Sequence, residues 1–95
     1  MNHIIKIPNF AFVKANRSYS GSYQGMRWKV WIEEEQLFAC AFPEPWSFAC
    51  TPEEKKLTRT FLPTEEDFFK AKNWLNSCYS EHFSIWEQAK QSTIF

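Results

Sequence analysis

The sequence has few glycines and no net charge. Only two of its 95 residues are glycine, which excludes collagen-like and glycine-rich low-complexity structure. Eleven basic residues balance eleven acidic ones, and this balance disfavours non-specific binding to nucleic acid through phosphate attraction. A chain of this length predicts a single domain over residues 1–95.

The N-terminal residues include no apolar run as long as a signal peptide or a membrane span requires. The three cysteines, at positions 40, 50 and 78, are an odd number at unpatterned spacings. Such a set is typical of reduced thiols rather than of a disulfide framework. We therefore expect a cytoplasmic protein that makes no membrane contact.

The sequence is rich in aromatic residues, which make up 19% of the chain. From Met26 to Glu33, apolar residues occupy the even positions, and this period of two indicates a strand with one buried face. A second strand, Gln36 to Phe42, is apolar on both faces and ends at Pro43, which cannot donate to a sheet ladder. With an even-length turn, large residues face small ones: Ile32 faces Leu37, Val30 faces Ala39 and Trp28 faces Ala41.

The same register sends a second set of side chains to the opposite face: Arg27, Lys29, Trp31, Phe38, Cys40 and Phe42. If helices cover only the other face, this set forms an aromatic and basic surface that marks a binding site. If the N-terminal segment (Ile4 to Val13) or the last helix covers it, the set is a second core. The facing depends on the turn at Glu34-Glu35, because a Glu-Glu pair is not favoured in two-residue hairpins.

Residues 1–25 are predicted to form an N-terminal segment and a loop. Ile4 to Ile7 has the pattern of a short strand, and Phe10 to Val13 that of a strand or a buried loop. The stretch from Asn16 to Gly25 is polar and carries both glycines, which predicts a surface loop. Its tyrosines, Tyr19 and Tyr23, are four residues apart, a spacing that also fits one helical turn.

Residues 26–62 are predicted to form the sheet. After Pro43-Glu44-Pro45, which should be extended, the stretch from Trp46 to Cys50 alternates again. Thr51-Pro52-Glu53-Glu54 carries the signals of a helix start, and it precedes a strand-like run from Leu57 to Leu62. We expect the helix there to last only about one turn.

Residues 64–91 are predicted to form two helices. The first begins at Thr64 as N-cap, with an acidic first turn and a capping box closed by Asp67. Its buried stripe follows helical spacing: Phe68, Ala71, Leu75 and Cys78. A second helix, from Glu81 to Gln91, turns Ile85, Trp86 and Ala89 inward. The predicted fold class is α+β: an antiparallel meander of three to four strands, with both helices packed on one side.

No known catalytic motif is present, and we predict no catalytic residue and no cofactor. Cys78 and His82 are four residues apart on a helix, as in half of a zinc site, but the spacing of Cys40 and Cys50 does not fit the other half. Cys78 also belongs to the apolar stripe, where a cysteine behaves as a small hydrophobe. We therefore predict no metal site. The two glycines precede a strand, whereas a phosphate-binding loop follows a strand and opens a helix.

Several short strings carry a resemblance: Asn16-Arg17-Ser18-Tyr19, Gly25-Met26-Arg27, Pro43-Glu44-Pro45, Thr51-Pro52-Glu53-Glu54-Lys55-Lys56 and Trp74-Leu75-Asn76. Through them the chain resembles small uncharacterised proteins carried by phages and mobile elements of Gram-positive bacteria. In size and lack of motifs it is similar to anti-CRISPR proteins and other phage inhibitors of host defence. The resemblance implies a non-enzymatic cytosolic binder of a bacterial protein, and it carries over no site residue.

The leading hypothesis from sequence is therefore a small protein-binding module, an inhibitor of a larger bacterial protein. Aromatic residues are enriched at interface hot spots, and the predicted partner-binding residues are Trp31, Phe38, Phe42, Arg27, Lys29, Tyr19, Tyr23 and Trp46. One alternative is a single-stranded nucleic-acid binder that uses the aromatic and basic sheet face. The other is an enzyme or enzyme subunit whose site the sequence does not reveal.

Overall fold

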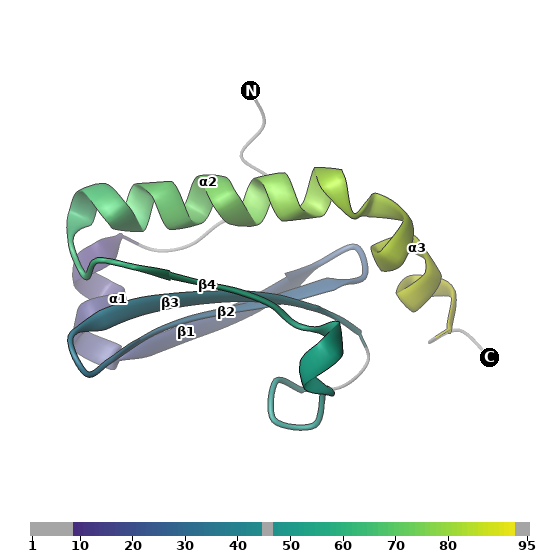
Figure 1. Cartoon of the computed structure of the whole chain (residues 1–95), viewed down its shortest axis with the longest axis horizontal. Helices are drawn as coiled ribbons and strands as arrows, with labels where there is room; N and C mark the ends of the chain where they lie inside the picture. Colours follow the sequence, from purple (N-terminus) through teal and green to yellow (C-terminus); the bar gives the residue numbers. More distant parts are fainter. Residues whose placement is uncertain (1–8, 45–46, 93–95) are drawn as a thin grey trace.

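A four-stranded antiparallel sheet organises the structure, in the order β1-β2-β3-β4. The computed structural model describes residues 9–44 and 47–92. Its strands are β1 (Ser18–Tyr23), β2 (Met26–Glu33), β3 (Gln36–Pro43) and β4 (Leu57–Phe61). Together with the helices on one side of this meander (Figure 1), they confirm the predicted α+β class.

The β2–β3 hairpin has the predicted register. Trp28 pairs with Ala41, Val30 with Ala39, and Ile32 with Leu37. The turn contains only Glu34 and Glu35, whose φ angles are 51° and 63°. Two positive φ angles are characteristic of a type I′ turn, whose twist matches that of the flanking strands. The hairpin therefore adopts the favoured geometry with two residues that are poorly suited to it.

Strand β1 replaces the surface loop that we predicted from Asn16 to Gly25, so that prediction and its helical alternative are wrong. Only Gln24 and Gly25 form the turn, with φ angles of 47° and 93°. Serine and glycine have low strand propensity, which hides the alternation of the segment. All six residues of β1 pair with β2, from Met26 to Trp31, and this pairing supplies the hydrogen bonds that stabilise β1 as a strand.

Helix α2 (Glu65–Glu81) covers one face of the sheet, which we call the inner face (Figure 1). The predicted N-cap is confirmed, since the Thr64 hydroxyl accepts a hydrogen bond from the Asp67 backbone N–H at 3.2 Å. The Asp67 carboxylate accepts from the Leu62 N–H at 2.9 Å, two residues before the N-cap. The predicted stripe is buried at all four positions: Phe68, Ala71, Leu75 and Cys78.

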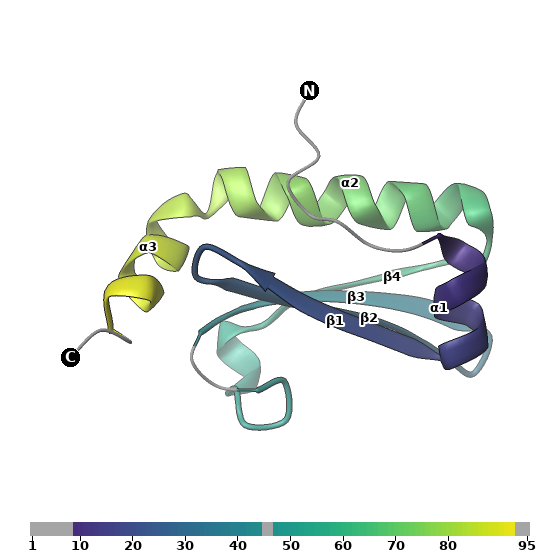
Figure 2. The ribbon, with the colours of Figure 1, turned by 180° about the vertical axis from the view of Figure 1, so that it is seen from behind.

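Two shorter helices pack at the ends of the inner face. Figure 2 shows α1 (Phe10–Asn16) at the end where α2 begins, and α3 (Phe83–Ser92) at the other end. The strand or loop predicted from Phe10 to Val13 is wrong, because the Asn9 side chain caps a helix there. The strand predicted at Ile4–Ile7 lies outside the described residues.

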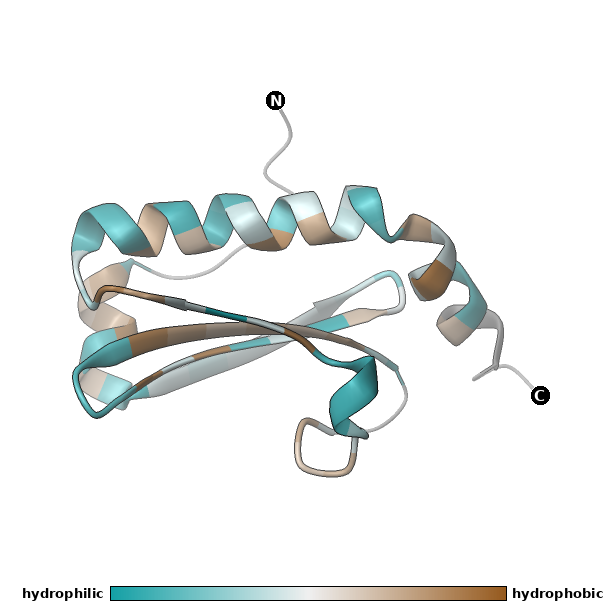
Figure 3. Ribbon diagram, viewed as in Figure 1, coloured by the Kyte–Doolittle hydropathy of each residue, from teal (hydrophilic) through white to brown (hydrophobic). Residues whose placement is uncertain are grey.

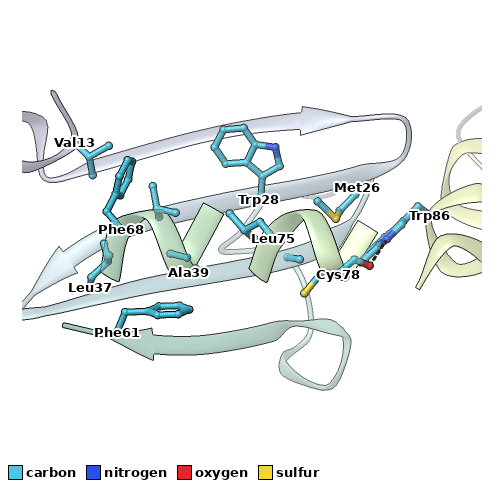
Figure 4. Close-up of a cluster of buried hydrophobic side chains, with 13 residues drawn as sticks. Val13, Met26, Trp28, Leu37, Ala39, Phe61, Phe68, Leu75, Cys78 and Trp86 are labelled. Carbon is cyan, nitrogen blue, oxygen red and sulfur yellow. Dashed lines mark hydrogen bonds between the residues drawn. The ribbon is translucent and has the colours of Figure 1, made fainter. Parts of the chain in front are cut away.

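The core lies between the sheet and the helices. Figure 4 shows its side chains, among them Val13, Trp28, Leu37, Leu75 and Trp86. Hydrophobic residues are concentrated in the sheet, most continuously along β3 (Figure 3). This distribution follows from the position of β3, a central strand with paired neighbours on both sides.

Helix α3 turns Trp86 and Ala89 inward, as predicted, but not Ile85. The Trp86 side chain is buried, and its indole Nε1 donates a hydrogen bond to the Cys78 carbonyl at 3.1 Å. Ile85 is 43% exposed, so its predicted inward position is wrong. Adjacent residues of a helix point about 100° apart, so Ile85 faces outward when Trp86 faces the core.

The connection from β3 to β4 lies on the side of the sheet opposite to α2 (Figures 1 and 2). The alternation from Trp46 to Cys50 does not produce a strand over the described residues 47–50. A short 3₁₀ helix, η1 (Glu53–Lys55), follows, as the helix-start signal predicted. Its N-cap is Pro52 rather than Thr51, because the Thr51 hydroxyl instead donates to the Ser47 carbonyl at 2.7 Å.

Candidate functional site

The sheet face opposite to α2, which we call the outer face, carries the predicted aromatic and basic residues. The pairing registers place on it the outward-facing residues of all four strands: Ser18, Ser20, Ser22, Arg27, Lys29, Trp31, Glu33, Gln36, Phe38, Cys40, Phe42, Thr58 and Thr60. The helices contribute their buried residues to the core on the inner face. The edge strands thus give the outer face hydroxyl groups, and the central strands give it aromatic and charged groups.

The centre of the outer face is a stacked pair of aromatic rings. Trp31 and Phe38 are directly opposite each other on β2 and β3. Their ring centroids are 5.1 Å apart and their planes differ by only 8°. Both side chains are half-buried, so the pair is firmly packed and still presents surface to a partner.

Phe48 from the β3–β4 connection covers one end of the outer face. Its ring contacts Phe42 at 5.8 Å between centroids and Trp31 at 5.1 Å, with an edge toward a face in both cases. Phe42 is therefore only 3% exposed, and its prediction as a surface contact residue is corrected. Phe48 was in neither predicted alternative. Of those alternatives, residues 10–13 and the last helix pack on the inner face, and residues 4–8 lie outside the described part of the chain.

Two lysines fix Phe48 in position. The Lys56 Nζ lies 3.9 Å from the Phe48 ring centroid and 3.3 Å from Glu53 Oε2. The Lys29 Nζ lies 4.6 Å from the same centroid and 5.3 Å from that of Trp31. Cations over ring faces are attracted by the ring quadrupole. This aromatic and cationic packing holds the connection against the sheet.

A hollow of about 390 Å³ lies beside Phe48, between the connection and strands β1 and β2. Arg27 and Lys29 line it, together with the serines Ser20, Ser22 and Ser47. No carboxylate is among its described lining residues. The Arg27 Nε is buried without a hydrogen-bond partner, and the ion pairs found within residues 9–44 and 47–92 involve neither Arg27 nor Lys29. The hollow is therefore electropositive and rich in donors.

The remaining predicted contact residues do not join this site. Tyr19 and Tyr23 point to the inner face, where Tyr19 packs against Trp28 and Tyr23 against Tyr79, with centroid distances of 5.7 and 5.2 Å. Trp46 lies outside the described residues. Of the eight predicted residues, the structure thus brings Arg27, Lys29, Trp31, Phe38 and the buried Phe42 together on the outer face.

Sequence reasoning missed Phe48 and Lys56 as parts of the site. The alternation from Trp46 to Cys50 did indicate that Phe48 packs on one side. No sequence signal specified which face of the sheet Phe48 would meet, because its contacts are with residues outside its own segment, on β2 and β3. No role in a site was predicted for Lys56, although its side chain is only 7% exposed in the structure.

The thiols are unreactive where they are buried. Burial raises the pKa of Cys40, whose Sγ accepts a hydrogen bond from the Thr58 hydroxyl at 3.4 Å. Burial, with a smaller contribution from the Glu81 carboxylate, raises the pKa of Cys78 to about 12. Cys50 is exposed. Within the described residues, no three His, Cys, Asp or Glu side chains are grouped as a metal ion would require.

Among the described residues, no helix has both the length and the apolar character to span a membrane. No protein-family model, curated protein or solved structure matches the chain. The geometry of the outer face is therefore the basis for inferring a function.

Proposed function

We propose that this protein is a small protein-binding module that engages its partner with the outer face. The observation that carries the proposal is the stacked Trp31–Phe38 pair, half-buried at the centre of a face on which α1, α2 and α3 do not pack. Binding energy in protein interfaces is concentrated in such packed aromatic anchors. An aromatic pair that is already stacked loses little conformational entropy on binding, which favours affinity.

The chemistry of this face suits binding better than catalysis. Among its titratable groups are the cations Arg27, Lys29 and Lys56, the exposed carboxylates of Glu33 and Glu53, and the thiol of Cys40. A nucleophilic cysteine requires an exposed thiol with a lowered pKa. Cys40 is fully buried and its pKa is raised, so we propose a non-enzymatic role.

The partner that we propose is a larger bacterial protein in the cytoplasm, which this chain would inhibit by covering part of its surface. The resemblance to small phage and mobile-element proteins, including anti-CRISPR-type inhibitors, supports this choice. Free thiols at all three cysteines fit a reducing compartment.

A second candidate is a binder of single-stranded nucleic acid. One observation favours it: Lys29, whose Nζ lies 5.3 Å from the Trp31 ring centroid, and Arg27, two residues away on the same face of β2, form no ion pair within the described residues. Bases stack on aromatic side chains while cations contact the backbone. Binding by this mode weakens steeply as salt concentration rises, which separates it from a protein partner.

The experiment is capture of a partner from bacterial lysate with tagged protein, followed by calorimetric titration of the purified partner. We expect Trp31→Ala and Phe38→Ala each to weaken binding about 30-fold, equivalent to roughly 2 kcal/mol. The matched controls are Phe69→Ala and Phe83→Ala, which remove aromatic residues that are exposed elsewhere on the molecule. If the control variants lose as much affinity as the Trp31 and Phe38 variants, the outer face is not the interface.

The nucleic-acid candidate is tested in parallel by titrating labelled oligothymidine at several salt concentrations. Tight binding that weakens steeply with rising salt concentration, and that Trp31→Ala abolishes, would show that the partner is nucleic acid rather than a protein. Absence of oligothymidine binding at low salt would eliminate this candidate.

A further inference from the structure

The hollow beside Phe48 contains positive charge that the described protein does not neutralise. Arg27 and Lys29 are half-buried, and neither forms an ion pair within residues 9–44 and 47–92. Lys56 differs in this respect, because its Nζ forms an ion pair with Glu53 Oε2 at 3.3 Å. The excess charge of the outer face is thus confined to the hollow at one end of β2.

The Arg27 Nε gives a second, independent indication that the hollow binds an anion. It is buried and has no hydrogen-bond partner. Buried donors are nearly always paired in folded proteins, since leaving one unpaired costs its full desolvation. An arginine binds a carboxylate or phosphate best when its Nε and a terminal nitrogen donate side by side. The Nε has almost no exposed surface, so it would form one half of such a fork once the Arg27 side chain turns toward the hollow.

We propose that this hollow binds the carboxylate of an acidic side chain on the protein partner. Arg27 would donate the two-pronged contact and Lys29 would supply the second positive charge, with serine hydroxyls at the rim. This inference rests on the proposed function, and it adds the chemistry of the partner. The partner then presents an acidic residue beside the apolar surface that meets Trp31.

The charge pattern along β2 favours a carboxylate over a phosphate backbone. Arg27 and Lys29 occupy one end of the strand, and Glu33 the other, followed by Glu34 and Glu35 in the turn. Glu33 is about 13 Å beyond Lys29 at roughly 3.3 Å per residue. A nucleic-acid strand that crossed the whole face would bring phosphates against these glutamates. A single acidic side chain from a folded partner can contact the Arg27 and Lys29 end of β2 without approaching these glutamates.

The test observes the Arg27 side chain directly by NMR of its Nε–H group. The protein is titrated with acetyl-Glu-Leu-amide, with the isosteric acetyl-Gln-Leu-amide, with inorganic phosphate and with an eight-residue oligothymidine. We expect the Glu peptide to shift the Arg27 Nε–H resonance downfield and to slow its exchange with water. The Gln peptide should leave both unchanged.

Variants assign the contacts. Arg27→Lys keeps a charge but removes the fork, and Lys29→Gln removes the second charge. We expect each to weaken binding of the Glu peptide about tenfold. The control Lys14→Gln removes one charge from the exposed surface of α1 and should leave the affinity unchanged. The backbone spectrum of each variant reports whether it is folded.

Three outcomes would overturn the inference. They are no response of the Arg27 Nε–H to the Glu peptide, an equal response to the Gln peptide, and a response to oligothymidine at far lower concentration than to the Glu peptide. These outcomes are distinguishable from failure of the proposed function. That failure appears as unchanged partner affinity in Trp31→Ala, a residue that does not line the hollow.

Discussion

Gly21 on β1 and Trp28 on β2 are in direct register, and no side chain fits on Gly21 above the indole. A Cβ placed on Gly21 would lie 2.6 Å from Trp28 Cζ2 and 2.9 Å from Cη2. Both distances are below any normal carbon–carbon contact. Trp28 is 4% exposed, so its ring has little space to move away. The glycine is therefore required by close packing.

We expect Gly21→Ala to lower the free energy of unfolding by about 1–3 kcal/mol, as overpacked substitutions do. The measurement is a urea denaturation midpoint with the m-value checked. Ser20→Ala, its neighbour on the outer face, should change stability by less than about 0.5 kcal/mol. In Trp28→Phe, which lacks the outer indole atoms, the cost of Gly21→Ala should shrink. An equal cost in both backgrounds would show that the indole is not the cause.

The Glu34-Glu35 turn provides a stabilising prediction. Both residues have positive φ, a conformation that costs non-glycine residues roughly 1 kcal/mol or more each. Replacing the pair by Asn-Gly, the preferred type I′ sequence, should raise the free energy of unfolding by about 1–2 kcal/mol. The double substitution to Gln-Gln removes the charges but keeps the backbone strain. It should therefore raise the free energy of unfolding much less. If Gln-Gln gains as much as Asn-Gly, repulsion rather than backbone conformation is responsible.

The two tryptophans of β2 should behave differently on truncation. Trp28 is buried in the core, and Trp28→Ala should cost about 3–5 kcal/mol. Trp31 is half-buried between Phe38 and Phe48, and Trp31→Ala should cost about 1–2 kcal/mol. Chemical denaturation of both variants, followed by circular dichroism, gives the comparison. Equal losses would mean that the outer face is a second core rather than a binding surface.

The buried Cys78 predicts a loss of stability at alkaline pH. Its pKa is raised to about 12 from an ordinary 9.0, so the folded state retains the proton over a range in which the unfolded state releases it. The stabilising effect is complete below pH 9 and is lost as pH rises from 9 to 12, with a slope approaching about 1.4 kcal/mol per pH unit. Urea midpoints measured between pH 8 and 11 test this.

The control for that prediction is Cys78→Ala, which removes the titrating group. Other groups also titrate in this range, so the informative quantity is the difference in slope between the wild type and the variant. The variant should show the shallower decline. Parallel declines would indicate that the Cys78 thiol does not contribute.

The local pattern of the sequence was sufficient for the elements whose burial is periodic. The stripe of α2 followed from spacing and its Thr64 cap from residue type, and the register of β2 with β3 followed once an even-length turn was assumed. Each of these features depends on residues within one element or on neighbours joined by a short turn. Period and cap chemistry therefore carry the information, and Trp28 and Trp31 were correctly sent to opposite faces.

Only the tertiary structure decided the features that depend on distant contacts. Strand β1 forms because β2 provides its pairing partner, against the low strand propensity of its serines. Phe48 covers Phe42 because the β3–β4 connection folds back under the sheet, where Lys56 and Lys29 hold its ring. Sequence spacing does not encode where a loop crosses a sheet, since that depends on the space that other elements leave. For the same physical reason the hollow at Arg27 could be found only in the folded chain.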